Sequence, residues 1–160
     1  MSSTFDHYLA TIMEEGAREA RQAGSATIEA EHLLLAVAAE GEATTRQVLV
    51  SASLDHQAIR EALDREFEHS LSAAGVSLGA FDLPRPSRAA KLPSQLGASA
   101  RLVLERMVGT FRKKDLRPAH LLLGILQAEV GTVPRALTLA GVDRHALAAQ
   151  ARRTITGQDD

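Results

Sequence analysis

The chain has 160 residues, of which 45% are apolar and only 3% aromatic. A chain of this length can bury enough surface to fold as one domain, and its Ala- and Leu-rich composition favours packed helices over sheets. The net charge of −2 excludes a strong overall field that would attract nucleic acid or an acidic membrane, and the lack of cysteine excludes disulfides and thiolate chemistry.

The first residues, MSSTFDHYLA, do not resemble a signal peptide, because no basic region precedes an apolar one. No apolar run approaches the ~18 residues that a membrane-spanning helix needs. We therefore expect a cytoplasmic protein with no membrane partner.

The first part of the chain predicts four helices. Apolar residues at helical spacing extend from about 6 to 22 and end before Gly24, a residue suited to a helix C-cap. Asp55 suits the N-cap of the fourth helix. The other three predicted helices cover residues 29–39, 43–51 and 55–71.

The second part of the chain predicts four more helices in the same order. Pro118 fits the first turn of the second of these, and Asp143 takes the capping place of Asp55. The four cover residues 98–110, 118–128, 132–140 and 143–155. We accordingly divide the chain into a first repeat (1–71), a linker rich in Pro, Gly and Ser (72–96), a second repeat (97–155) and a disordered tail (156–160).

Two stretches carry the clearest sign of duplication. EAEHLLLAV, residues 29–37, matches RPAHLLLGI, residues 117–125, so that His32 corresponds to His120 at an offset of 88. The same offset aligns the two capping aspartates without a gap. Shared apolar spacing of this kind indicates an internal repeat, and we expect an all-α fold of about eight helices in two pseudo-symmetric halves.

The first copy, ARQAGSATIEAEHLLLAVAAEGEATTRQVL followed by SLDHQAI, resembles the N-terminal repeat domain of the Clp ATPase chaperones. The second copy, which begins ARLVLERMVGTFRKKDLRPAHLLLGIL, resembles the same repeat. The resemblance implies a compact eight-helix module that receives substrates or adaptors for a AAA+ unfoldase. The chain contains no GxxxxGK[ST] phosphate-binding loop, so we expect neither ATP hydrolysis nor another catalytic activity.

In ClpC-class domains that recognise phosphoarginine, each repeat resembles a half-site with a glutamate that pairs with the guanidinium and a threonine that helps to hold the phosphate. Glu31 matches the glutamate, whereas Ala119 stands in its place in the second copy. Asp6 and Gly97 occupy the threonine places, and Asp6 would repel a phosphate. The resemblance therefore implies at most one arginine-type site, on the Glu31 side.

Phe5 and Leu96 occupy matching places near the starts of the first helices of the two repeats, where we expect a peptide-binding surface. His32 and His120 stand in the first turns of helices whose next residues are core leucines. We interpret both histidines as structural, because histidine in such a place usually spaces helix ends through hydrogen bonds. The alternative for Glu31 is that it has no binding role, because a carboxylate near a helix start stabilises the helix through the helix dipole.

The expected function is binding of a protein or peptide without cofactor or metal. The partner would be a Clp ATPase, its adaptor or its substrate, and the bound group an arginine- or phosphoarginine-type degron or a cyclic peptide. The sequence leaves open whether such a protein delivers cargo or acts as a decoy.

Two other functions fit parts of the sequence. Glu29 with His32, and Glu66 with His69, form two Glu-x-x-His pairs, which are half of a di-iron carboxylate bundle. The second alternative is a DNA-binding accessory that uses the basic run Arg112–Arg117. No aromatic residues alternate with those basic ones, so a solvated loop or an acidic protein partner suits the run better.

Overall fold

Eight α-helices dominate the computed structural model, which describes residues 4–75 and 91–157. No strand element occurs in those two ranges, and the all-α prediction is confirmed. A 3-10 turn, Lys113–Asp115 (η1), precedes α7. The helices are Thr4–Gln22 (α1), Ala30–Glu40 (α2), Ala43–Ser51 (α3), His56–Ala73 (α4), Ala98–Thr110 (α6), Pro118–Leu126 (α7), Thr132–Leu139 (α8) and Arg144–Thr156 (α9).

The helix ends follow from local chemistry that the sequence shows. Gly24 adopts a left-handed conformation with φ 73°, and the Ser25 N–H donates back to the Ala20 carbonyl at 2.8 Å, which ends α1. Asp55 Oδ1 accepts a hydrogen bond from the Ala58 N–H at 2.8 Å at the start of α4. In the same way, at the start of α9, Asp143 Oδ1 accepts from the Ala146 N–H at 3.1 Å.

The observed helix ends differ from the predicted ones by at most two residues. Helix α7 ends at Leu126, two residues before its predicted end. The Gln127 N–H still bonds to the Leu123 carbonyl, and the next helix begins after Gly131. Helix α4 continues to Ala73, two residues into the predicted linker. Most of that linker, residues 76–90, and the predicted tail residues 158–160 lie outside the described residues.

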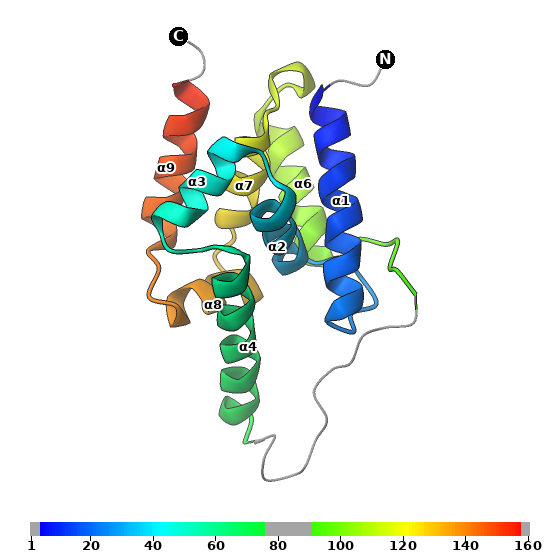
Figure 1. The fold of residues 1–160 in the computed structure, drawn as a ribbon, viewed down its shortest axis with the longest axis vertical. Coiled ribbons are helices and arrows are strands. Elements are labelled where there is room, and N and C mark those ends of the chain that lie inside the picture. Colours follow the sequence, from blue (N-terminus) through cyan, green and yellow to red (C-terminus); the bar gives the residue numbers. More distant parts are fainter. Residues whose placement is uncertain (1–3, 76–90, 158–160) are drawn as a thin grey trace.

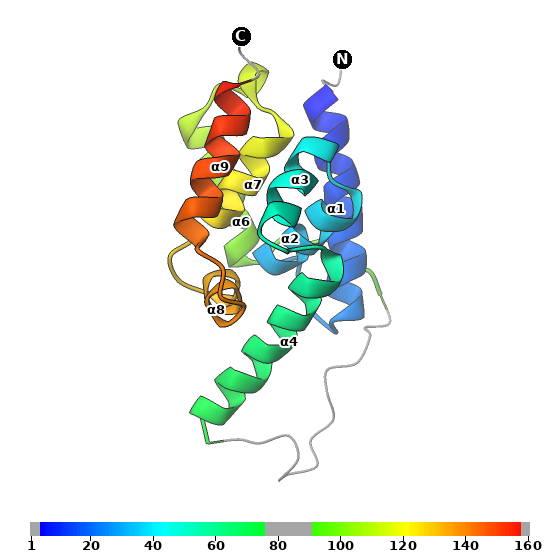
Figure 2. The same cartoon turned by 60° about the vertical axis from the view of Figure 1, so that its left-hand side comes forward.

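Helices α2 and α7, which carry the two His-Leu-Leu-Leu motifs, lie at the centre and contact each other (Figure 1). Helix α1 packs on α2, and α6 packs on α7. The last helix of each repeat also contacts the other repeat: α4 packs on α8, and α9, which packs chiefly on α7, also contacts α3. Figure 2 shows that the C-terminal half of α4 extends beyond the other helices.

The core is built from the two leucine triplets and the helices around them. Leu33, Leu34 and Leu35 are at most 5% exposed, and the triplet 121–123 is at most 2% exposed. Together with residues from every helix they form one hydrophobic cluster. Because the cluster spans both repeats, neither repeat has a separate core. None of the helices within the described residues is long and apolar enough to span a membrane.

We expect equal stability costs when the central leucine of either triplet is truncated. Leu34 and Leu122 are 1% and 0% exposed, so Leu34→Ala and Leu122→Ala should each lower the free energy of unfolding by ~2–5 kcal/mol. Val108→Ala, at a side chain that is 71% exposed, serves as the control and should cost under ~0.5 kcal/mol. Urea denaturation measures all three. A cost at only one triplet would contradict a single shared core.

Candidate binding site

A short stretch of paired backbone joins the two repeats. The Ile28 N–H donates to the Gln95 carbonyl at 2.9 Å, and the Gly97 N–H donates to the Ile28 carbonyl at 2.9 Å. These bonds form an isolated parallel bridge between Ile28 and Leu96. The starts of α2 and α6 therefore lie against each other, although about 70 residues separate them in the chain.

Glu29 connects these two helix starts through its side chain. Its Oε2 atom accepts hydrogen bonds from the Ser99 hydroxyl and from the Ser99 N–H, the latter at 3.3 Å, and its Oε1 accepts from the Thr27 hydroxyl at 2.9 Å. The Ser99 hydroxyl in turn accepts from the Ala30 N–H at 2.8 Å. Burial alone would raise the pKa of Glu29, but the bonds from Ser99 and Thr27 hold it below its ordinary value.

Gly97 lies directly against this carboxylate. A Cβ atom at Gly97 would overlap the Glu29 side chain. The backbone of Gly97 is extended (φ −76°, ψ 175°), a conformation open to any residue, so the constraint is lack of space and not backbone conformation.

The two histidines of the repeat motif make the same hydrogen bond. His32 Nδ1 accepts from the Glu29 N–H at 2.9 Å, and His120 Nδ1 accepts from the Arg117 N–H at 2.9 Å. Each histidine thus satisfies the N–H of the residue before its helix, as Glu or Gln does in a capping box. Burial lowers the pKa of His32 to about 4, although Glu29 and Glu19 oppose that shift.

Two cavities adjoin the start of α2. The first, here called the junction groove, has a volume of about 300 Å³ and lies between the starts of α2 and α6 and the segment before α8. The second, the acidic cleft, has a volume of about 340 Å³ and lies between the end of α1, the start of α2 and α4. Glu31 and Thr132 line both cavities, so the two meet at these residues.

The walls of the two cavities differ in character. Two exposed apolar side chains stand at the junction groove, Leu102 (47% exposed) and Val130 (86%). Other residues that line this groove include Ala98, Ser99, Arg106, Val133 and Arg135. Residues that line the acidic cleft include Glu19, Leu35, Leu63, Asp64, Glu66 and Phe67.

Two of the carboxylates in the acidic cleft have basic partners. Glu19 pairs with His56 Nε2 at 2.6 Å and with the Arg60 guanidinium at 2.7 Å. Glu66 pairs with Arg135 Nε at 2.9 Å. Since both carboxylates are over 90% buried, these pairs compensate the desolvation of the charges.

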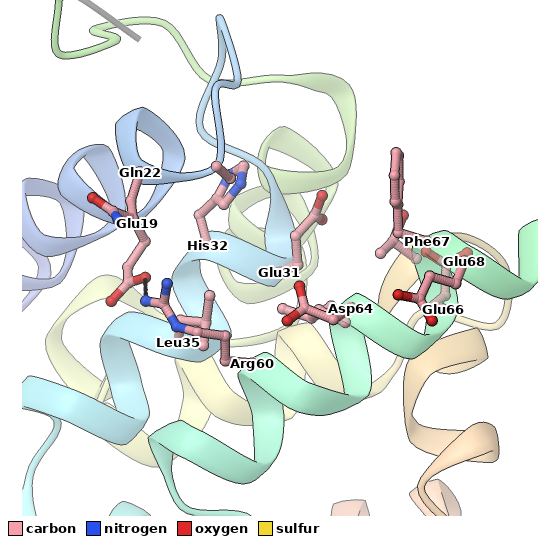
Figure 3. Close-up of a pocket in the computed structure, with 13 residues that line it drawn as sticks. Glu19, Gln22, Glu31, His32, Leu35, Arg60, Asp64, Glu66, Phe67 and Glu68 are labelled. Atoms are coloured by element: carbon pink, nitrogen blue, oxygen red, sulfur yellow. Dashed lines mark hydrogen bonds and ion pairs between the residues drawn. The ribbon is translucent and has the colours of Figure 1, made fainter. Parts of the chain in front are cut away.

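Two more carboxylates that line the cleft, Glu31 and Asp64, form no ion pair with any residue in the described ranges. Glu31 is half-buried, and this burial is the main reason why its pKa is raised. The charges of Glu29 and Glu66 raise the pKa further, whereas Arg135 lowers it. In Figure 3, Glu31 and Phe67 project from α2 and α4 towards the same side of the cleft.

The predicted site residues do not gather on one surface. Phe5 and Ala119 are 7% and 4% exposed and belong to the interior, and Gly97 is buried against Glu29. Leu96 is half-buried in the backbone bridge. Of these four, only Leu96 and Gly97 lie near Glu31.

Asp6 lies far from Glu31 in the fold. Asp6 is at the start of α1, where it is 3.9 Å from Lys113 of η1, whereas Glu31 shares the acidic cleft with Gln22 at the end of that helix. The structure therefore does not bring together Asp6 and Glu31, the residues that stand in the two places of a half-site in the first repeat. Glu31 faces the start of the other repeat's first helix.

The di-iron arrangement is not formed. Glu29 bonds to Ser99, His32 Nδ1 accepts a backbone N–H, and Glu66 pairs with Arg135. His69 is exposed. No group of three or more His, Asp or Glu side chains within residues 4–75 and 91–157 is arranged to hold a metal ion.

Most of the cavity residues were not predicted from the sequence. Asp64 and Phe67 are on α4, and Leu102 is on α6, so only packing brings them near Glu31. One signal was present: Phe67 lies three residues after Asp64, which places both on one helix face, and aromatic residues are rare in this chain.

Comparison with known proteins supports the fold. Residues 4–97 match the family described as "Clp repeat (R) N-terminal domain". Among solved structures, the N-terminal domain of the caseinolytic protease-associated chaperone ClpD from Arabidopsis thaliana superposes with a TM-score of 0.65 at 20% identity, over 97% of this chain and 98% of that one. Among curated proteins, none matches the sequence.

Replacing Gly97 should reveal the contact with Glu29. Gly97→Ala must displace the carboxylate from Ser99 and Thr27, and we expect it to lower the free energy of unfolding by about 1–3 kcal/mol. In a Glu29→Ala background the same change should cost much less, because the obstacle is gone. A double-mutant cycle measured by urea denaturation tests this. Additive costs would show that Gly97 and Glu29 do not interact.

His32 should make the fold sensitive to acid. Its folded pKa of about 4 lies below the unfolded value of ~6.5, so the unfolded chain binds more protons between these values and stability falls as the pH drops through that range. His32→Gln keeps an acceptor for the Glu29 N–H but does not titrate. Between pH 7 and pH 4.5 this variant should lose less unfolding free energy than the wild type, by on the order of 2 kcal/mol.

Urea denaturation at the two pH values measures that difference. His145→Gln, at an exposed position on α9, is the matched control and should retain the wild-type acid sensitivity. Equal acid sensitivity of the His32 variant and the wild type would contradict the role assigned to His32.

Proposed function

Because the chain belongs to the family of Clp repeat N-terminal domains, we propose that it is a non-catalytic module that binds protein or peptide segments. The observation that carries this proposal is the junction groove, an indentation of about 300 Å³ to which both repeats contribute walls. Apolar side chains exposed at a concave surface are typical of binding sites.

The junction groove suits an extended segment with apolar side chains. Leu102 and Val130 are exposed there, and Ala98, Val133 and Pro134 also line the groove. A peptide that covered these side chains would remove apolar surface from water, which favours binding by roughly 25 cal/mol for each Å² buried. A cyclic peptide with apolar side chains has the same complementarity and a smaller loss of conformational entropy.

Glu31 adds charge selectivity to the groove. Its half-buried carboxylate has no ion-pair partner within the described residues, and a guanidinium can donate two parallel hydrogen bonds to it. Arg106 and Arg135 also line the groove and could face the phosphate of a phosphoarginine. We propose arginine-type degrons as ligands, with one site per chain, because Ala119 in the second repeat is buried and uncharged.

We propose that the chain acts in the cytoplasm as an accessory or decoy in Clp-dependent proteolysis. The phosphate-binding loop GxxxxGK[ST] does not occur in the 160 residues, so these residues supply binding and not ATP hydrolysis. A reconstituted Clp protease and a fluorescent substrate distinguish the two roles. An accessory would speed degradation when the chain is added, whereas a decoy would slow it.

Glu31→Gln should weaken binding and stabilise the unliganded fold. Fluorescence anisotropy with leucine-flanked peptides that carry arginine, phosphoarginine or citrulline measures the first effect. We expect the variant to lose 1.5–3 kcal/mol of affinity for arginine-type peptides, the range of a charge-assisted hydrogen bond. Glu40→Gln, at the exposed far end of α2, is the matched control and should bind as the wild type does.

The stability effect follows from the raised pKa of Glu31. When the folded pKa exceeds the unfolded one, the folded state favours the protonated form, so the ionised carboxylate costs stability at neutral pH. Glutamine resembles the neutral form and removes this cost, and thermal unfolding at pH 7 should show a higher Tm for Glu31→Gln. Unchanged affinity in the variant, with no arginine-type peptide preferred over citrulline, would leave Glu31 as a helix-start residue only.

A further inference from the structure

The acidic cleft is a second cavity whose contents the proposed function does not specify. Its charged residues are Glu19, Glu31, Asp64, Glu66 and Glu68, with Arg60 as the one basic residue among the side chains that line it. The pairs that Glu19 and Glu66 form with His56, Arg60 and Arg135 compensate two of these charges. Glu31 and Asp64 place further negative charge where α2 faces α4.

Glu31 and Asp64, which form no ion pair within the described residues, differ in their access to water. Glu31 is half-buried and its charge is poorly solvated, whereas Asp64 is exposed at the rim. A cation between them would lose its contact with water on the Glu31 side and keep it on the Asp64 side. Such a place favours a side chain with a long apolar stem and a charged end, because the stem can pack while the end stays partly hydrated.

Apolar surface for such a stem lies next to the carboxylates. Leu35 and Leu63 line the cleft, and Phe67, at 38% exposure, stands at its wall on α4. A cation close to an aromatic ring gains further electrostatic stabilisation. Leu63, Asp64 and Phe67 come from one helix, α4, whose C-terminal half extends beyond the other helices (Figure 2).

The acidic cleft is continuous with the junction groove. Both are lined by Glu31 and by Thr132, the first residue of α8. A single extended segment that occupies the junction groove with an apolar side chain can therefore place a neighbouring side chain in the acidic cleft. The two cavities together would then recognise two side chains of the same segment, each of a different type.

Resting on the proposed function, we propose that the acidic cleft binds an unmodified lysine or arginine side chain of the segment whose apolar residue occupies the junction groove. The ammonium or guanidinium lies between Glu31 and Asp64, and the stem packs on Leu63 and Phe67. A phosphorylated arginine is excluded from this cleft, because the carboxylates that line it outnumber the guanidinium groups of Arg60 and Arg135 beside them. The preferred ligand is thus a segment in which a basic residue lies close to an apolar one.

The test uses residues that line only one of the two cavities. Asp64→Asn alters only the acidic cleft, and Leu102→Ser alters only the junction groove, since neither residue lines the other cavity. Glu61→Gln is the matched control, because it removes the same charge from the same helix at an exposed position outside the cleft. Circular dichroism confirms that each variant is folded.

The probes are two fluorescein-labelled peptides, Ala-Leu-Lys-Ala-Leu-Ala and Ala-Leu-Gln-Ala-Leu-Ala, with dissociation constants measured by fluorescence anisotropy at low salt. The wild type should bind the lysine peptide at least five-fold more tightly than the glutamine peptide. Asp64→Asn should remove most of that preference, and Glu61→Gln should retain it. Binding of the glutamine peptide should be the same in the wild type and in Asp64→Asn.

The two proposals fail in different ways. If Leu102→Ser weakens both peptides but Asp64→Asn changes neither, the junction groove binds segments and the inference about the acidic cleft is overturned. The inference is also overturned if the wild type binds the lysine and glutamine peptides alike, or binds neither. If Asp64→Asn removes the lysine preference while Leu102→Ser has no effect, the cleft binds a cation and the proposed role of the junction groove fails.

Discussion

The backbone pairing of Ile28 with Leu96 is the constraint on which the candidate binding surface depends. It brings the start of α2 against the start of α6, where the free N–H groups of two helices would otherwise face one another with like partial charge. The Glu29 carboxylate resolves this conflict, since it accepts from Ser99 at one helix start while it precedes the other. Glu31, two residues further on, is thereby fixed at the boundary between the junction groove and the acidic cleft.

The two copies differ in their polar residues because the starts of α2 and α7 contact different parts of the fold. Glu29 corresponds to Arg117, and the Arg117 guanidinium is 3.4 Å from the Ile155 carbonyl near the end of α9. A carboxylate therefore stands at a helix start in one copy, and a guanidinium stands near a helix end in the other, each with the sign that the helix dipole favours. Ala119 corresponds to Glu31 and is buried, so the second copy fills with a methyl group the place where the first exposes a carboxylate. The two copies thus share buried leucines in the core and differ in the residues at their helix starts.

The sequence predicted the fold well because its signals are local. Apolar spacing, Gly24, Asp55 and Asp143 each act within one or two helical turns, and the structure confirms the helices that they delimit. The lining of the two cavities was not predicted because it depends on contacts between segments far apart in sequence. Glu31 was singled out from the resemblance, but its neighbours were not, since no local pattern shows that the start of α6 faces α2 or that α4 brings Asp64 and Phe67 to the same cleft. Phe5 was misplaced for a related reason: an apolar residue at a helix start can face solvent or the core, and packing alone decides.

Arg135 shows why a half-buried carboxylate can persist at this place. Its guanidinium lies near both Glu66 and Glu31, and it pairs with Glu66, the more deeply buried of the two, which also accepts a hydrogen bond from the Ser70 hydroxyl. The most desolvated charge thus receives the internal partner, because leaving it alone would cost the most. Glu31 keeps enough contact with water to remain ionised without an internal partner. Its raised pKa shows that the ionised form lowers the stability of the fold. A basic side chain from a bound segment would do for Glu31 what Arg135 does for Glu66, and the free energy regained on pairing would add to the affinity.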